Sequence, residues 1–194
     1  NSGTTTFDIS GDFNMDGGDF LLDYSSGEST VIVGGDFNQT AGVLDLSNAS
    51  FADNDISTLE LHGNFTQSGG EIIETFNNIG LIQFSKTGTQ TYSQAGTISN
   101  TVRMQVDAGS TLSLESNANL PARVTINGTL LFGNSARTFS IENTAADVLQ
   151  GNGTIDMQNA DHILDYKGSS IAFNGTFIAG NSGTVRFSRN GDQT

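Results

Sequence analysis

The chain has 194 residues, of which 35% are hydrophobic, and its net charge is −14 because 21 acidic residues outnumber 7 basic ones. This balance argues against binding to nucleic acids and to anionic membrane surfaces, since both need a basic footprint. The absence of cysteine excludes disulfides and thiolate metal sites, and no apolar run approaches the ~18 residues that a membrane-spanning helix requires.

Alternation of apolar and polar residues predicts many short strands, and the Gly, Asn, Asp and Ser residues between them supply the turns. In chain order, the predicted strands are 30–33, 43–46, 58–61, 81–84, 102–106, 111–114, 124–126, 129–132, 138–141, 154–157, 163–166, 171–173, 176–178 and 184–187. No segment shows the period of about 3.6 residues that a helix requires, although residues 143–150 could form one helical turn. The pattern therefore predicts an all-β protein.

The first half of the chain repeats a short phrase around an aromatic residue. The phrase is Gly-Asp-Phe-Asn at Phe13 and Phe37, Gly-Asn-Phe-Thr at Phe65, and the degenerate Gln-Thr-Tyr-Ser at Tyr92. The aromatic residue thus returns roughly every 24–28 residues, and a strand-rich repeat of this length is typical of a solenoid. We predict a right-handed parallel β-helix of about 22–28 residues per coil and roughly eight coils, with these four rings stacked in an internal or corner ladder.

The second half has its own echo. The phrase Asn-Gly-Thr recurs at residues 127–129, 152–154 and 174–176, which is close to the same period. A longer echo relates residues 84–91 to residues 187–194. We therefore interpret residues 1–194 as one continuous solenoid segment with sub-blocks 1–101 and 102–194, and as a fragment of a longer repeat array.

Aspartates at equivalent places on adjacent coils are a candidate for metal binding. Asp12 and Asp36 should stack about 5 Å apart, and like charges opposite one another are unfavourable. Either they lie on a solvated outer face, where screening makes the cost small, or they hold Ca²⁺ between them. Further candidates in turn contexts are Asp16 with Asp19 and Asp53 with Asp55. None of them fits a known Ca²⁺ loop, so we assign no metal and no cofactor, and Ca²⁺ stays an alternative.

Catalytic motifs do not emerge from the sequence. His62 and His162 are the only histidines, they have no partners in the sequence, and we expect both on the surface. No Ser-His-Asp, Cys-His or HExxH arrangement is available. Paired acids abound, as a glycosidase would need, but the turns are short and even and leave no room for a cleft. We assign no catalytic residue and predict that the chain is not an enzyme.

Three phrases carry a resemblance to a known class of proteins. Gly-Asp-Phe-Asn-Gln-Thr-Ala-Gly (35–42), Gly-Asn-Phe-Thr-Gln-Ser-Gly-Gly (63–70) and Phe-Ser-Lys-Thr-Gly-Thr-Gln-Thr (84–91) resemble the repeats of giant gliding and adhesion proteins on the surface of Bacteroidota. Filamentous-haemagglutinin-like β-helix adhesins are similar more distantly. The resemblance implies secretion to the cell surface, a β-solenoid stalk, and a role in adhesion or as a surface filament.

The expected function is that of a stiff acidic rod, a structural or adhesive segment of an extracellular filament. Its expected partners are the neighbouring coils of a longer chain, and surface glycans or other filaments, with no nucleic acid and no membrane insertion. The alternative is a carbohydrate-active β-helix enzyme, a polysaccharide lyase or hydrolase, or a glycan-binding solenoid. A groove lined by Tyr, Arg and two acids would favour the enzyme, whereas an even polar wall would favour the rod.

Overall fold

The computed structural model describes residues 3–22, 27–47, 56–76, 79–121, 123–158 and 160–190, which contain 22 β-strands and no helix. The strands are β1 (Thr5–Ile9), β2 (Phe13–Leu21), β3 (Ser29–Val33), β4 (Phe37–Asp45), β5 (Ile56–Leu61), β6 (Phe65–Gln67), β7 (Glu71–Ile73), β8 (Ile79–Phe84), β9 (Gly88–Gln94), β10 (Thr97–Ile98), β11 (Arg103–Val106), β12 (Ser110–Leu114), β13 (Ala118–Leu120), β14 (Arg123–Ile126), β15 (Thr129–Leu131), β16 (Thr138–Ile141), β17 (Leu149–Gly151), β18 (Thr154–Asp156), β19 (Ile163–Tyr166), β20 (Ala172–Phe173), β21 (Thr176–Ile178) and β22 (Thr184–Phe187).

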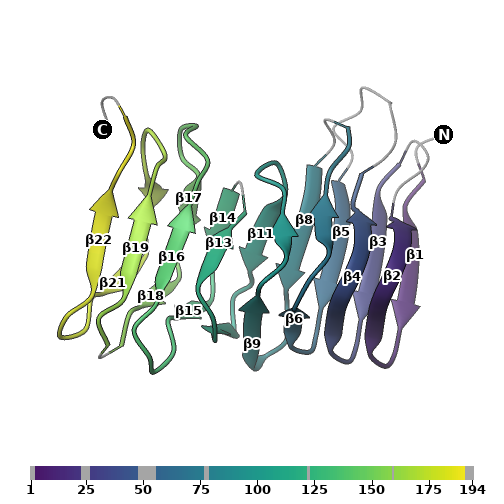
Figure 1. Ribbon diagram of the computed structural model, residues 1–194, viewed down its shortest axis with the longest axis horizontal. Coiled ribbons are helices and arrows are strands. Elements are labelled where there is room, and N and C mark those ends of the chain that lie inside the picture. The colour runs from purple at the N-terminus through teal and green to yellow at the C-terminus, as the bar shows by residue number, and fades with distance from the viewer. Residues whose placement is uncertain are drawn as a thin grey trace.

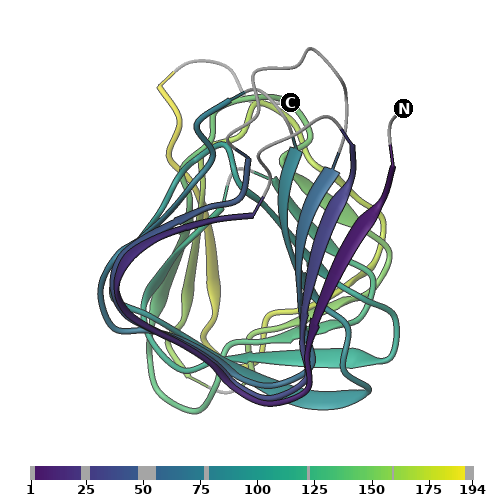
Figure 2. The same cartoon turned by 90° about the vertical axis from the view of Figure 1, so that its right-hand side faces the viewer.

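These strands stack coil upon coil in parallel sheets, side by side along the long axis of the molecule (Figure 1). The first sheet has the order β1-β3-β5-β8-β11-β14-β17-β20, and the second begins with the long strands β2 and β4 and ends at β21. A third sheet, β13-β16-β19-β22, adds another wall in the C-terminal half. Viewed from the N-terminal end, the coils follow one another around a common interior (Figure 2).

The predicted parallel β-helix is thus confirmed as a β-solenoid of about seven turns. The eight strands of the first sheet enclose seven turns between them, one fewer than the rough count from sequence. Coil length varies more than predicted. Ser29 pairs with Ser57 and closes a long coil, whereas Arg103 pairs with Arg123 and closes a much shorter one (123 − 103 against 57 − 29).

Alternation along each strand sends one set of side chains inward. In β3, Val31 and Val33 are buried while Thr30 and Ile32 are only half-buried, as expected for β-branched residues on a pleated strand with one buried face. Eight strands were missing from the prediction: β1, β2, β6, β7, β9, β10, β13 and β17. Most are rich in Gly, Gln, Thr or Asn, so the apolar alternation is interrupted. The single helical turn considered at residues 143–150 is instead a turn that leads into β17.

The aromatic ladder lies inside the solenoid, as predicted. Ring centroids are 5.4 Å apart between Phe13 and Phe37, 5.1 Å between Phe37 and Phe65, and 4.8 Å between Phe65 and Tyr92, with ring planes within 8° of parallel. Phe37, Phe65 and Tyr92 are at most 1% exposed. Leu114 is the register partner of Tyr92 and continues the column with an aliphatic side chain.

A second internal column consists of glutamines. Gln39, Gln67 and Gln94 are register partners on successive coils, and all three are buried. Gln67 Nε2 donates to Gln39 Oε1 at 3.0 Å and to the carbonyl of Thr97 at 3.0 Å. Gln39 Nε2 donates to the carbonyls of Gly42 and Glu71. The amides therefore satisfy main-chain carbonyls beside the bend of each coil, where Gly42 and Gly70 have φ of 83° and 75°.

Candidate functional site

The aspartate column has a structural use that the sequence did not suggest. The main-chain N–H of Asp36 donates to Asp12 Oδ1 at 2.8 Å, and the N–H of Asn64 donates to Asp36 Oδ1 at 2.7 Å. The N–H of Thr91 donates in turn to Asn64 Oδ1 at 2.9 Å. Each side chain thus accepts a main-chain hydrogen bond from the next coil, and an amide oxygen serves as well as a carboxylate. This ladder explains why Asn64 can follow two aspartates.

The other candidate cation ligands do not come together in the described part of the chain. Asp16 and Asp19 lie exposed on β2, while Asp53 and Asp55 lie outside the described residues. No group of three or more His, Cys, Asp or Glu side chains in the described ranges is placed to hold a metal ion. Ca²⁺ at the aspartate column therefore stays a prediction for experiment.

The two histidines differ. His62 is exposed, and its Nε2 lies 2.8 Å from Glu60 Oε1. His162 is 0% exposed, so the expectation of a surface position is wrong for this residue. Its ring packs edge-on against Phe132, at 5.6 Å between centroids, and its Nε2 lies 3.2 Å from the carbonyl oxygen of Gly133. The cause is strand parity, because His162 alternates inward with the buried Leu164.

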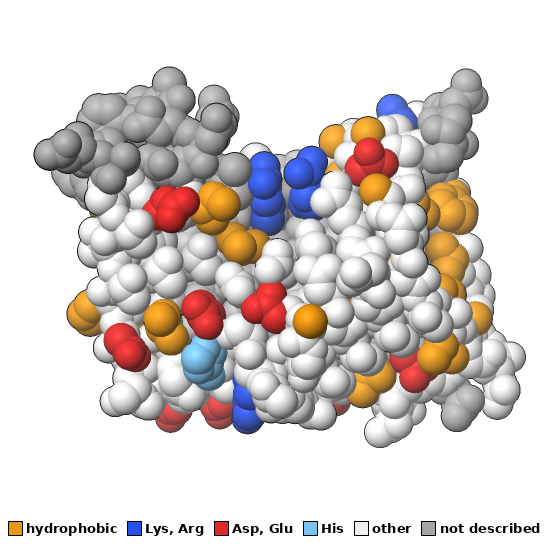
Figure 3. Space-filling view, turned by 180° about the vertical axis from the view of Figure 1, so that it is seen from behind, with side chains coloured by type: hydrophobic (Ala, Val, Ile, Leu, Met, Phe, Trp, Pro, Cys, Tyr) orange, Lys and Arg blue, Asp and Glu red, His pale blue; other side chains and the backbone are white. Residues whose placement is uncertain are grey.

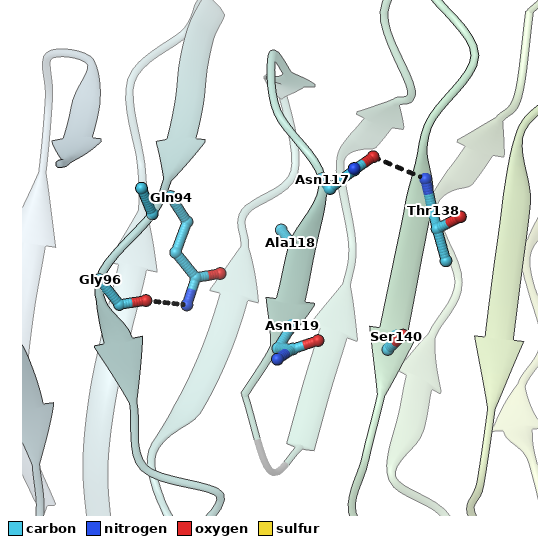
Figure 4. Close-up of a pocket in the computed structure, with 8 residues that line it drawn as sticks. Gln94, Gly96, Asn117, Ala118, Asn119, Thr138 and Ser140 are labelled. Atoms are coloured by element: carbon cyan, nitrogen blue, oxygen red, sulfur yellow. Dashed lines mark hydrogen bonds between the residues drawn. The ribbon is translucent and has the colours of Figure 1, made fainter. Parts of the chain in front are cut away.

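A hollow of about 310 Å³ opens on the wall between β10 and β13 (Figure 4). Its lining is made of uncharged residues: Gln94, Ala95, Gly96, Asn117, Ala118, Asn119, Thr138 and Ser140. Asn117 Oδ1 accepts the main-chain N–H of Thr138, and Gln94 Nε2 donates to the carbonyl of Gly96. The side chains of Asn119 and Ser140 make no hydrogen bond to another described residue, so they are available to a ligand.

The hollow arises where the ladder between two coils is interrupted. The N–H of Glu115 still donates to the carbonyl of Tyr92, but one step later Ser116 Oγ takes the place of the main chain and bonds both the N–H and the carbonyl of Gln94. Beyond this point β10 pairs only with β7, and β13 only with β16. The facing edges of β10 and β13 are not paired with each other in the described part of the chain, and Figure 4 shows the labelled lining residues on both sides of this break.

A short coil explains the interruption. The coil that contains β13, from Arg103 to Arg123, is shorter than the coils on either side, which run from position 81 to 103 and from position 124 to 149, so its corner is recessed. The two flanking coils contact each other across this recessed corner. Asn143 Nδ2 lies 3.4 Å from the carbonyl oxygen of Asn100, which is two coils away. The hollow is thus a built feature of coil length. The short coil is visible in the sequence only once Arg103 and Arg123 are known to be register partners, because they are closer in the chain than the predicted repeat of about 22–28 residues. The sequence alone does not give this pairing.

The corner that precedes the first sheet holds a carboxyl group with a perturbed pKa. Burial raises the pKa of Glu74 to about 7. Hydrogen bonds from the Gly80 N–H, 3.3 Å from Oε1, and from Thr101 oppose this rise, and so does the charge of Arg103. The charge of Asp45 adds to the rise. No feature of the sequence marks Glu74, because its burial depends on the fold.

Asp45 is the second acid of this corner, and its oxygens are in use. It is 2% exposed and accepts the N–H of Ser47 and the N–H of Thr75, both at 3.2 Å, while Thr75 Oγ1 donates to it at 2.5 Å. Asp45 therefore ties one coil corner to the next.

A glycosidase-type pair needs a free second carboxylate, and the hollow between β10 and β13 contains no acid, arginine or aromatic side chain among the described residues that line it.

Among the described residues, no helix has the length and apolarity needed to cross a bilayer. Protein-family models, curated proteins and solved structures give no match to this chain. Its class is therefore defined by its own architecture, which is that of a β-solenoid.

Proposed function

We propose that this chain is a structural and adhesive segment of a secreted bacterial cell-surface filament or adhesin, where it acts as a stiff acidic rod. The observation that supports this most is the set of columns that join coil to coil. The aromatic ladder Phe13–Phe37–Phe65–Tyr92 runs through four coils, and the glutamine and aspartate ladders run beside it. A solenoid whose coils are cross-tied at several columns resists bending, because any bend must break nearest-neighbour contacts.

The exterior fits the same proposal. A net charge of −14 keeps rods soluble and apart, and it disfavours nucleic acids and anionic membranes as partners. The proposed partners are further coils of the same kind, surface glycans and other filaments.

Small-angle X-ray scattering of the purified chain, combined with an attachment assay, tests this function. The chain is coupled to beads, and the beads are counted on glycan-coated, protein-coated and bare surfaces. Because about seven turns span only about 34 Å along the axis, we expect the scattering profile of one compact, rigid particle. We also expect retention of the coated beads on at least one surface above that of beads carrying serum albumin. Retention no greater than that of the albumin beads on every surface would contradict the adhesive role, and a flexible scattering profile would contradict the rod.

The hollow between β10 and β13 favours a second function, glycan binding without catalysis. Amide and hydroxyl side chains match the donors and acceptors of a neutral sugar, and a cavity of about 310 Å³ is at the small end of ligand pockets. Calorimetry with neutral oligosaccharides tests this reading. Asn119→Ala with Ser140→Ala should abolish binding, whereas the exposed Thr66→Ala on β6 is the control and should leave it unchanged. Equal binding by all variants would place the sugar elsewhere.

A further inference from the structure

Two arginines lie directly opposite each other on adjacent coils. Arg103 begins β11 and Arg123 begins β14, and the two are register partners in the first sheet, where neighbouring strands lie about 4.8 Å apart. Both side chains are half-buried. Burial lowers the pKa of the Arg103 guanidinium, and the charge of Arg123 lowers it further. Like charges in this position repel each other, so the pair costs stability in the free protein.

No described carboxylate forms an ion pair with either arginine. Elsewhere in the described part of the chain, ion pairs join Arg137 with Glu115, Lys167 with Glu142, and Arg186 with Asp165. Neither Arg103 nor Arg123 has a carboxylate oxygen within the 4.0 Å of an ion pair among the described residues. An uncompensated positive pair is unexpected in a chain with a net charge of −14. Figure 3 looks onto the first sheet and shows Lys or Arg side chains side by side in a hollow at its upper margin.

Glu74 is the acidic group whose charge acts on Arg103. Its charge raises the pKa of Arg103, and the charge of Arg103 lowers that of Glu74, yet burial raises the pKa of Glu74 to about 7, so the carboxyl is largely protonated only well below that pH. The charged groups that act on Glu74 are Arg103 and Asp45, and the neutral groups that bond it are Gly80 and Thr101. Below pH 7 the arginine pair is therefore less compensated than above it.

We propose that Arg103 and Arg123 bind an oxyanion, the carboxylate or sulfate group of an acidic polysaccharide, and that Glu74 makes this binding stronger at low pH. Guanidinium groups recognise such anions through paired N–H donors, and two arginines on neighbouring strands offer two such forks to one anionic residue. Protonation of Glu74 removes the competing negative charge, so anion binding and proton uptake are coupled. The proposal rests on the proposed surface function for the origin of the ligand.

Calorimetry with soluble probes tests the site without relying on bead attachment. The probes are oligogalacturonate, a dextran sulfate oligomer, and inorganic sulfate as the free anion. Binding to wild type is measured at about pH 5.5 and about pH 8.5, on either side of the pKa of Glu74. We expect oligogalacturonate or dextran sulfate to bind about tenfold more tightly at the lower pH, and Arg103→Gln or Arg123→Gln to weaken binding about tenfold or more.

Two matched variants separate a specific site from general charge. Lys86→Gln removes one positive charge at an exposed position after β8 and should leave binding unchanged. Glu74→Gln should bind tightly at both pH values. Equal weakening by Lys86→Gln and Arg103→Gln, or an unchanged pH dependence in Glu74→Gln, would overturn the proposal. Inorganic sulfate binding as tightly as the oligosaccharides would assign the site to a free anion and overturn the polysaccharide.

A measurement of the melting temperature tests whether Arg103 acts on the fold and not on a ligand. Removing one of two repelling charges should leave the melting temperature of Arg103→Gln equal to or above that of wild type. A lower melting temperature together with weaker binding would show that Arg103 supports the fold and not a ligand. Failure of the probes to bind at all would end this inference and leave the rod function to be judged by scattering and attachment.

Discussion

Gln67 donates from Nε2 to Gln39 Oε1 across 3.0 Å, and both side chains are 0% exposed. This bond joins two coils inside the solenoid, beside the stacked rings of Phe37 and Phe65. Apolar and polar columns thus run in parallel through the same interior. The polar column fixes the register, because a slip by one residue would leave its amides without partners and would send the rings outward.

Replacing Gln67 by Leu tests the polar column. The substitution keeps a side chain of comparable size but removes the donor to Gln39 Oε1 and to the Thr97 carbonyl. We expect a loss of about 1–3 kcal/mol in the free energy of unfolding, because a buried acceptor loses its partner. Urea denaturation measures it, with Thr66→Ala as an exposed control on the same strand. A Gln67→Leu variant as stable as wild type would show that the amide bond contributes nothing.

Replacing Phe37 by Ala tests the aromatic column. Phe37 lies between two stacked rings and is 0% exposed, so the truncation should leave a cavity and cost about 3–5 kcal/mol. Thermal unfolding followed by circular dichroism gives the change. Phe7→Ala is the matched control, since Phe7 is 58% exposed and should matter little. An unchanged melting temperature for Phe37→Ala would contradict the internal position of this ring.

Asp36 tests the hydrogen-bond ladder on the outside of the coils. Asp36→Asn keeps an oxygen that can accept the N–H of Asn64, so its stability should lie within about 0.5 kcal/mol of wild type. Asp36→Ala removes the acceptor and should cost about 1 kcal/mol. If both variants lose the same stability, the charge matters and not the hydrogen bond.

Ca²⁺ is the remaining alternative for Asp12 and Asp36. Because their oxygens already accept main-chain N–H groups, we expect no stabilisation by the ion. Thermal unfolding with added Ca²⁺ is compared with unfolding in EDTA. A melting temperature that rises with Ca²⁺ in wild type, and not in Asp12→Asn, would place an ion at this column.

Stability should depend on pH through Glu74. The pKa of this group is about 7 in the folded chain against an ordinary value of 4.5, so the folded state binds more protons between these values. The free energy of unfolding should therefore fall as pH rises from about 4.5 to about 7. Above about pH 7, Glu74 should cause no further change in this free energy. Glu74→Gln should remove the fall. Melting temperatures across this range measure it, and identical pH profiles for the two proteins would contradict the raised pKa.

The sequence predicted the features that recur from coil to coil. Phe13, Phe37, Phe65 and Tyr92 recur at coil spacing, and this was enough to place them in one column with Asp12 and Asp36 in register beside them. The sequence did not predict the glutamine column, because the glutamine two positions after Phe37, Phe65 and Tyr92 is polar, and apolar alternation places polar residues on the outside. The arginine pair and the hollow were not predicted either, because both depend on one shortened coil. Phe84 ends β8 in the first sheet and Phe187 ends β22 in the third, so this sequence echo places similar residues on different walls.

A cross-link between coils tests the stacked register most directly. The chain contains no cysteine, so Asn38→Cys with Thr66→Cys creates one pair at positions that are register partners on adjacent coils. Neighbouring strands are close enough for a disulfide, whereas Asn38→Cys with Ser68→Cys lies out of register. Mass spectrometry after mild oxidation should find the disulfide in the first variant and free thiols in the second. Free thiols in the first variant, or equal oxidation of both, would contradict the stacking of these coils.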